Sequence, residues 1–238
     1  MSRAEGFTKL LNDLVAAVVS AETDQAEIQA SQVEYSATTK YTIPWPYPRT
    51  EVLTFFAGIG LFDPDWARSW RLACGANLGR SRGRWREVFS LAYEHESFTI
   101  ADQDGSSSLV IPGVSWTQTI ANDLVFATHG HRFRFDVRGS HTAALSSVSF
   151  VQLRGETKVV RRPFARLRFL ARATVARTWT DAFRELPPTV RFVTGGDQTV
   201  RGYAYESLGP VNAAGELVGG DSLVVGSAEL DYRFLGSW

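Results

Sequence analysis

The chain has 238 residues, which is enough for one large domain, and its hydrophobic content of 44% argues against disorder. Lysine and arginine total 25, as do aspartate and glutamate, so the net charge is zero and composition favours no polyanionic partner. The single cysteine, Cys74, excludes an intramolecular disulfide framework and the usual structural zinc sites, and no apolar run reaches the length of a membrane-spanning helix.

The N-terminal region is the least informative part of the chain, and we treat residues 1–30 as an uncertain segment or strand. Residues 10–22 fit a strand or a short helix, and we favour the strand. Asp13 interrupts the apolar stretch and no clear cleavage site follows, so the region is a poor secretory signal.

From about residue 33, apolar and polar side chains alternate with the period-two pattern of β-strands. The alternating segments are 33–43, 53–61, 70–78, 89–93, 109–119, 133–137, 151–159, 167–175 and 224–234. Arginines crowd the polar side between positions 132 and 177. Because they alternate with apolar residues, they indicate strands with one charged face rather than a nucleic-acid site. We therefore predict an all-β, antiparallel domain over residues 31–238.

A soluble β-sandwich and a membrane β-barrel both alternate in this way. Segment length favours the barrel, because tilted membrane strands need about ten residues or more. Aromatic residues near segment ends resemble an interfacial girdle; they are Trp45, Tyr47, Trp66, Trp70, Trp85, Trp179 and Trp238. The connections are expected to be short on one side (44–49, 79–83, 161–163) and longer on the other (99–106, 141–147, 182–221). This asymmetry is typical of outer-membrane barrels, and a soluble β protein is the alternative.

The longest predicted connection, residues 182–221, has no strand pattern and is rich in glycine. Positive φ at glycine allows such a loop to fold back into a barrel. Residues 187–203 read PPTVRFVTGGDQTVRGY, followed by YESLGP at 205–210 and GGDSLVVGSAE at 219–229. A lone Arg-Gly-Tyr carries no information, but this block of about forty residues in order is a specific signature.

The block resembles the lumen-inserted loop of the BamA/TamA superfamily of outer-membrane assembly barrels, the bacterial surface antigen family, and its flanks resemble the TamA-like branch. The resemblance covers roughly residues 30–238 and implies an antiparallel transmembrane β-barrel with a lumen-inserted loop. About ten strands of a barrel of sixteen are expected here, numbered three to twelve in the family. We therefore expect a partial barrel, without the last four strands or the periplasmic domains of the family.

The resemblance implies a non-enzymatic role in the bacterial outer membrane. It would be the barrel portion of a translocation and assembly module, an insertase for outer-membrane proteins such as autotransporters. The expected partners are the outer-membrane lipid bilayer, unfolded outer-membrane protein clients and a TamB-like periplasmic protein, with no nucleic acid and no cofactor. Two alternatives are a two-partner secretion pore, which shares the Arg-Gly-Tyr loop, and the barrel module of an exported patatin-like lipase with no activity of its own.

In the resembling family, the loop arginine enters the lumen and meets acidic groups on neighbouring strands. The candidate site therefore comprises the loop motif and one strand residue: Gly195, Gly196, Asp197, Val200, Arg201, Gly202 and Tyr203, with Glu229. A guanidinium in a partly desolvated lumen requires a counter-charge, and its planar fork can hold a carboxylate bidentately. The alternative is that Arg201 and Glu229 are separately solvated lumen charges.

Other chemistry has little support in the sequence. No Gly-x-Ser-x-Gly elbow is present to hold a nucleophile, so we expect no catalytic residue. His129 and His131 have no evident third ligand, so we expect no metal site. Glu94, His95 and Glu96 are expected on a solvated rim at a strand end.

Overall fold

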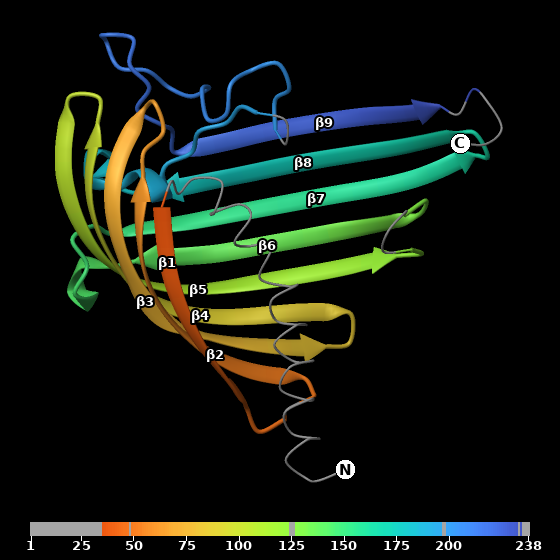
Figure 1. Ribbon diagram of the computed structural model, residues 1–238, viewed down its shortest axis with the longest axis horizontal. Helices are drawn as coiled ribbons and strands as arrows, with labels where there is room; N and C mark the ends of the chain where they lie inside the picture. The colour runs from red at the N-terminus through yellow and green to blue at the C-terminus, as the bar shows by residue number, and fades with distance from the viewer. Residues whose placement is uncertain (1–34, 48, 124–126, 197–198, 233, 235–238) are drawn as a thin grey trace.

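The structure is a computed structural model that describes residues 35–47, 49–123, 127–196, 199–232 and 234. These residues form one antiparallel sheet of nine strands, in which every strand pairs with its neighbour in sequence (Figure 1). The strands are β1 (Tyr35–Pro44), β2 (Glu51–Phe62), β3 (Ala67–Arg82), β4 (Trp85–Ile100), β5 (Gln103–Ala121), β6 (Gly130–Ser140), β7 (Phe150–Phe164), β8 (Leu167–Trp179) and β9 (Ser222–Tyr232). The predicted all-β, antiparallel fold is confirmed, while the strand proposed for 10–22 lies outside the described residues.

Within the described residues, helical structure is confined to three short 3-10 turns in the connections: η1 (Thr142–Ala144), η2 (Phe183–Glu185) and η3 (Pro188–Val190). Among the residues that the structure describes, no helix has the length and apolar character needed to cross a membrane.

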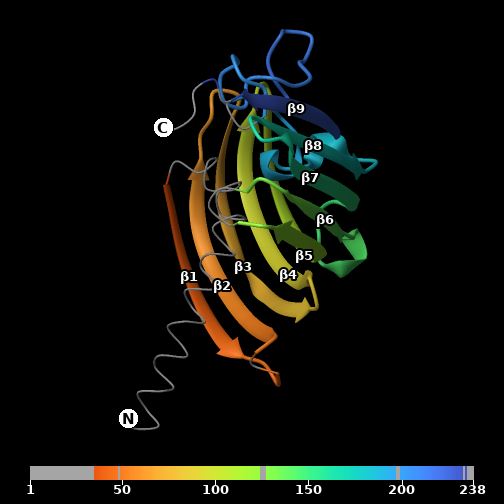
Figure 2. The ribbon, with the colours of Figure 1, turned by 90° about the vertical axis from the view of Figure 1, so that its right-hand side faces the viewer.

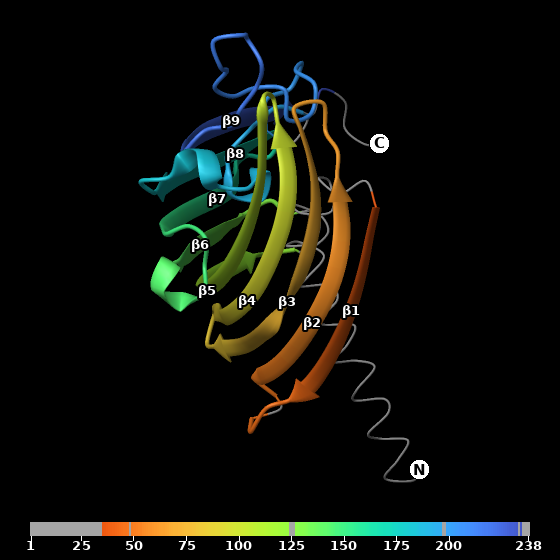
Figure 3. The ribbon, with the colours of Figure 1, turned by 90° about the vertical axis from the view of Figure 1, so that its left-hand side faces the viewer.

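The sheet curves like part of a barrel wall, with β1 and β9 as its two edges (Figures 2 and 3). Its two faces follow the sequence alternation. On β8, Leu170, Ala176 and Thr178 are buried, whereas Val175 and Trp179 are exposed. The same alternation on the other strands leaves a set of large apolar residues exposed: Phe55, Ile59, Trp70, Leu72, Phe89, Leu91, Phe133, Phe135, Val151, Val224 and Leu230. Apolar residues outside and polar residues inside is the pattern of a membrane barrel.

The inner face is lined by polar side chains that are nevertheless buried. They include Ser69, Glu94, Glu96, Ser107, Ser115, Gln152 and Thr178. Cys74 is exposed on β3 and has the same parity as the outward Trp70 and Leu72. A long connection covers part of the inner face, and it contacts Glu96 and Gln152 of this set directly.

The connections differ from the prediction in three places: residues 79–82 belong to β3 and residues 161–163 to β7, so those two turns lie at 83–84 and 165–166. Residues 99–106 were expected to form a long loop, but β4 and β5 pair through Ile100 and Gln103, so only Ala101 and Asp102 form the turn. Ala101 adopts a positive φ of 52°, as tight hairpins require. Burial of Phe98 and Ile100 extends β4 to this turn. The expected length asymmetry therefore holds only for the connections 141–149 and 180–221 on that side.

The aromatic girdle is confirmed only in part. Trp45, Tyr47 and Trp85 are exposed near the turns at one end of the sheet, and Trp179 is exposed at the other end. Trp66 is instead buried, with 8% of its surface exposed, because it packs under the long loop. Trp238 lies outside the described residues.

The apolar core lies between the sheet and the long loop rather than between two sheets. One cluster joins Leu109, Ile111, Val148 and Phe150 of the wall to Leu186 and Val190 of the loop. A second joins Phe62, Trp66, Ala67, Phe98 and Ile100 to Val193, Leu217 and Val218. The loop therefore packs on two patches of the wall, one at β5 to β7 and one at β2 to β4.

Candidate functional site: the loop between β8 and β9

Residues 180–221 leave the end of β8, pass through η2 and η3, and return to start β9 (Figure 1). We call residues 195–196 and 199–203 the loop tip and residues 180–194 and 204–221 the loop base. The base is held together by two antiparallel backbone pairs, Phe192 with Gly220 and Thr194 with Leu208, each with N to O distances of 2.8 Å. The tip is thus a hairpin-like extension of a compact base.

Arg191 links the two arms of the loop base. Its guanidinium donates hydrogen bonds to the carbonyls of Leu186 (2.9 Å), Arg184 (2.9 Å) and Val218 (3.0 Å), and it stacks over the ring of Phe183. Desolvation lowers the pKa of Arg191 to about 10, so the side chain is a cation at neutral pH. One charged group therefore gathers the two arms of the base.

The wall grips the base at Thr189 and Val190. The Thr189 hydroxyl donates to Glu96 Oε2 at 2.6 Å, and Arg138 Nη2 donates to the Thr189 carbonyl at 3.3 Å. Gln152 Nε2 donates to the Val190 carbonyl at 2.9 Å. Arg138 Nε donates to Gln152 Oε1 at 2.6 Å, so the groups form one network from β4, β6 and β7.

This network predicts a specific effect of the Thr189 hydroxyl. Thr189→Val keeps the side-chain shape but leaves the buried Glu96 carboxylate without this donor, which should cost about 1–3 kcal/mol of stability. We expect trypsin to cleave the loop faster in this variant. Thr189→Ser keeps the hydroxyl and is the matched control, with cleavage close to the wild-type rate. Equal cleavage of the valine and serine variants would show that the hydroxyl contributes nothing.

A further contact ties the base to the β2–β3 connection. The indole of Trp66 donates to Glu206 Oε2 at 3.3 Å, and both residues are buried. Glu206 adopts a positive φ of 51°, which is unusual for a residue with a side chain. Such backbone strain persists where surrounding contacts impose it.

The loop tip depends on its glycines. Gly195 and Gly196 have φ values of 125° and 93°, and a Cβ at Gly195 would lie 2.3 Å from the Ala204 carbonyl oxygen. Gly202 also has a positive φ, of 89°. These positions let the chain reverse, with Gly196 N bonded to the Tyr203 carbonyl at 3.2 Å.

Three motif residues remain: Val200, Tyr203 and Asp197. Val200 pairs with Gly196 within the tip, and Tyr203 is exposed. Asp197 lies outside the described residues.

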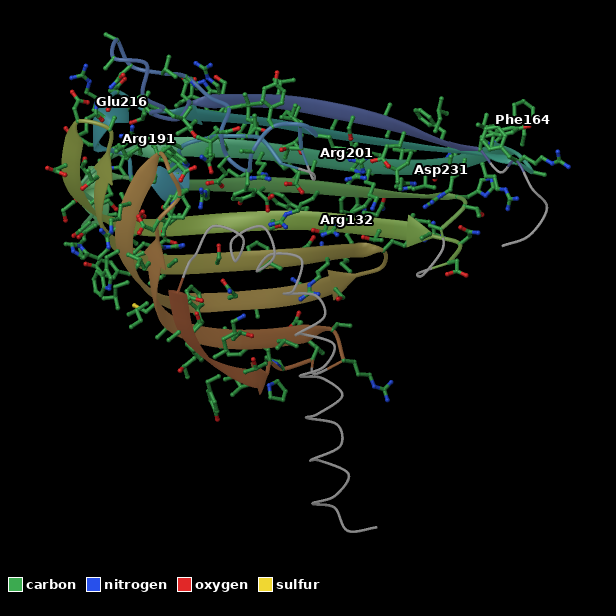
Figure 4. All side chains as sticks on the ribbon, turned by 45° about the horizontal axis from the view of Figure 1, so that its top comes forward. Arg132, Phe164, Arg191, Arg201, Glu216 and Asp231 are labelled. Carbon is green, nitrogen blue, oxygen red and sulfur yellow. The ribbon has the colours of Figure 1, made fainter. Side chains whose placement is uncertain are left out.

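The tip extends along the inner face toward β9. Figure 4 shows Arg191 near the loop end of the strands and Arg201 farther along them, in the direction of Asp231. Arg201 Nη2 lies 3.5 Å from Glu229 Oε1. Glu229 is seven residues beyond Ser222, the first residue of β9, or roughly 23 Å at a strand rise of about 3.3 Å. The structure therefore brings the two sequence-predicted charges within ion-pair distance, and their functional role stays a prediction.

Glu229 also accepts from a residue that the sequence did not single out as its partner. Arg172 Nη2 on β8 lies 2.6 Å from the same Oε1 atom. The neighbouring pair Arg168 and Asp231, at 3.2 Å, joins residues that lie directly opposite each other, whereas Arg172 and Glu229 are diagonal neighbours. Cross-strand charge pairs of this kind follow directly from the β8–β9 register.

The expectation for Glu94, His95 and Glu96 was wrong. Glu96 is 1% exposed and Glu94 is 8% exposed and paired with Arg71 at 2.5 Å, so neither lies on a solvated rim. His95 points to the opposite face and bonds Ser108. The two glutamates are two residues apart on β4 and share its inner face, and no local pattern in the sequence marks the loop that covers this face.

His129 and His131 contact different groups. His129 bonds Thr128 in the β5–β6 connection, and His131 contacts Gln118 and Phe133 on the wall. Within the described ranges, no group of three His, Cys, Asp or Glu side chains is arranged as metal ligands.

Comparison with known proteins agrees with this architecture. Residues 17–237 match the Omp85 superfamily domain. The fold is similar to the crystal structure of BamA from Haemophilus ducreyi lacking POTRA domains 1–3, with a TM-score of 0.73 and 15% sequence identity. That match covers 85% of this chain and 46% of the BamA chain, so this chain spans about half the length of the protein it matches.

Proposed function

This chain belongs to the Omp85 superfamily, and from that premise we propose that it is the barrel portion of an outer-membrane protein insertase. It would lie in the bacterial outer membrane and help unfolded outer-membrane proteins enter the bilayer, without enzymatic activity. The finer proposal is a TamA-like translocation and assembly module, with autotransporters among its clients and a TamB-like periplasmic protein as a partner. The residues that support this branch are the loop flanks at 205–210 and 219–229.

The observation that carries the proposal is the re-entrant tip, which reaches a buried polar wall and places Arg201 beside Glu229. A passive anchor needs only a stable wall with an apolar outer face. Here the inner face instead holds a long loop through two apolar patches and a charged network. We infer that the proposed assembly activity requires the loop to be docked on the inner wall, and that the loop is more than an exposed connection between strands.

A double-mutant cycle tests the proposal. Arg201→Ala and Glu229→Ala are made separately and together, and assembly of an autotransporter client into the outer membrane is measured. If the two charges act as a unit, the effects should be non-additive by about 0.5–3 kcal/mol. Arg84→Ala, in the β3–β4 turn, is the control and should leave assembly unchanged.

The outcomes separate the classes of function. Additive effects of the two substitutions would exclude the pairing as the working element. Normal assembly of clients together with loss of secretion of one dedicated exoprotein would indicate a two-partner secretion pore. Normal assembly with loss of surface exposure of a fused upstream lipase domain would indicate an anchor module.

A further inference from the structure

Glu229 is shared by two arginines that reach it from different parts of the molecule. Both ion pairs converge on the same oxygen, Oε1, with Arg172 Nη2 at 2.6 Å and Arg201 Nη2 at 3.5 Å. The side chain of Arg201 is 67% exposed, whereas those of Arg172 and Glu229 are each 28% exposed. The closer and more buried partner is therefore the strand residue, and the loop residue is the weaker one.

The Arg172–Glu229 pair is built into the sheet. In the β8–β9 ladder, Leu170 lies opposite Glu229 and Arg172 lies opposite Ser227, so the charged pair is a diagonal neighbour on one face. Its geometry follows from the backbone register alone. Arg201, by contrast, reaches Glu229 from the loop tip, whose path depends on the glycines at 195 and 196.

A row of cationic side chains crosses the inner wall beside this contact, next to the carboxylates of Glu156 and Asp231. Arg172 lies directly opposite Lys158 on β7, and Lys158 lies directly opposite Arg132 on β6. Like charges that face one another across strands are destabilising. Glu229 offsets part of this row through Arg172, and Arg201 brings one more cation to the same carboxylate.

We propose that Arg172 is the resident partner of Glu229 and makes Arg201 a releasable latch. When the tip moves away, Glu229 keeps the Arg172 guanidinium, so release leaves no uncompensated carboxylate on the inner wall. When the tip docks, Arg201 must share an occupied oxygen and approach a cationic row. Arg172 thereby sets how long the latch stays closed. The inference rests on the proposed working role of the Arg201–Glu229 contact.

Trypsin cleavage after Arg201 measures release of the tip while Arg201 itself stays intact. Glu229→Gln removes the carboxylate, so cleavage should become faster, by about threefold for a partly exposed ion pair. Arg172→Gln frees Glu229 for Arg201, so cleavage should become slower than in the wild type by about the same factor. The double variant should behave like Glu229→Gln, because Arg172 influences the tip through that carboxylate. Arg172→Lys, which keeps a cation, should return cleavage toward the wild-type rate.

Controls separate the latch from general stability. Arg168→Gln removes the next charge pair along β8, with Asp231, and should leave cleavage after Arg201 unchanged. Cleavage after Arg84, in the β3–β4 turn, reports loosening of the wall as a whole. If Arg172→Gln prevents folding, Arg172→Met, which keeps an apolar stem, takes its place in the same comparison.

Faster or unchanged cleavage after Arg201 in a folded Arg172 variant would overturn the proposal, since it would make Arg172 a support for the latch or irrelevant to it. The test does not use client assembly. Slower cleavage with additive assembly effects of Arg201 and Glu229 would keep the latch and reject its proposed role. Non-additive assembly effects with unchanged cleavage would do the reverse.

Discussion

Leu186→Ala is expected to detach the loop base from the wall. Leu186 has no exposed surface and packs against Val190 and the β5 and β7 residues Leu109, Ile111 and Phe150. Removing a buried leucine side chain of this kind costs about 2–5 kcal/mol, because the contacts are lost and a cavity remains. The loop should then become the first part of the chain to be digested by trypsin, and the urea midpoint of the protein in lipid vesicles should fall.

The matched control for this substitution is Leu145→Ala. Leu145 lies in the β6–β7 connection with 87% of its surface exposed, so its truncation should change neither measurement. Similar losses in the two variants would mean that the packing of the loop base contributes no specific stability.

Val175→Arg should prevent or strongly weaken insertion into a bilayer, whereas Thr174→Arg should be tolerated. Val175 is 55% exposed on the outer face of β8, and an arginine that faces lipid costs roughly 2–4 kcal/mol at the midplane and less toward the interfaces. Thr174 faces inward and lies opposite Glu156 on β7, whose carboxylate pairs with Arg154 at 2.6 Å and would also face the new cation.

Folding yield into vesicles, read from the heat-dependent shift in gel mobility, compares these two neighbouring positions in one strand. The assignment of the outer face would be wrong if the two arginine variants folded equally well. Because both substitutions add the same charge to adjacent residues, a difference between them reports the face on which the arginine lies and the groups that it meets there.

The alternation of the sequence was sufficient to predict the sheet and the assignment of its two faces. Each segment needed only local information, since side chains two residues apart lie on one face of a strand. The order of residues around Arg201 was likewise sufficient to place the chain in its superfamily, which the Omp85 domain match over residues 17–237 confirms.

The parts that the sequence did not predict depend on contacts over long separations. Glu96 is buried because Thr189, 93 residues away, lies on it, and Trp66 is buried because Glu206, 140 residues away, accepts its indole hydrogen. Neither residue has a local pattern that marks it as covered. The tight turn at Ala101 was missed for a related reason: residues 99–106 read as a loop, although pairing places all of them except Ala101 and Asp102 in β4 and β5.

The loop also has a mechanical meaning for the curved wall. It is fixed to β2–β4 and to β5–β7 through its base, and it touches β9 through Arg201, so it runs like a chord across an arc. Any motion that flattens the arc lengthens the distance which this chord must span. Of the contacts along it, the exposed 3.5 Å pair at the tip should part before the buried apolar patches do. The chord would thus register a change in the curvature of the wall as the making or breaking of a single ion pair.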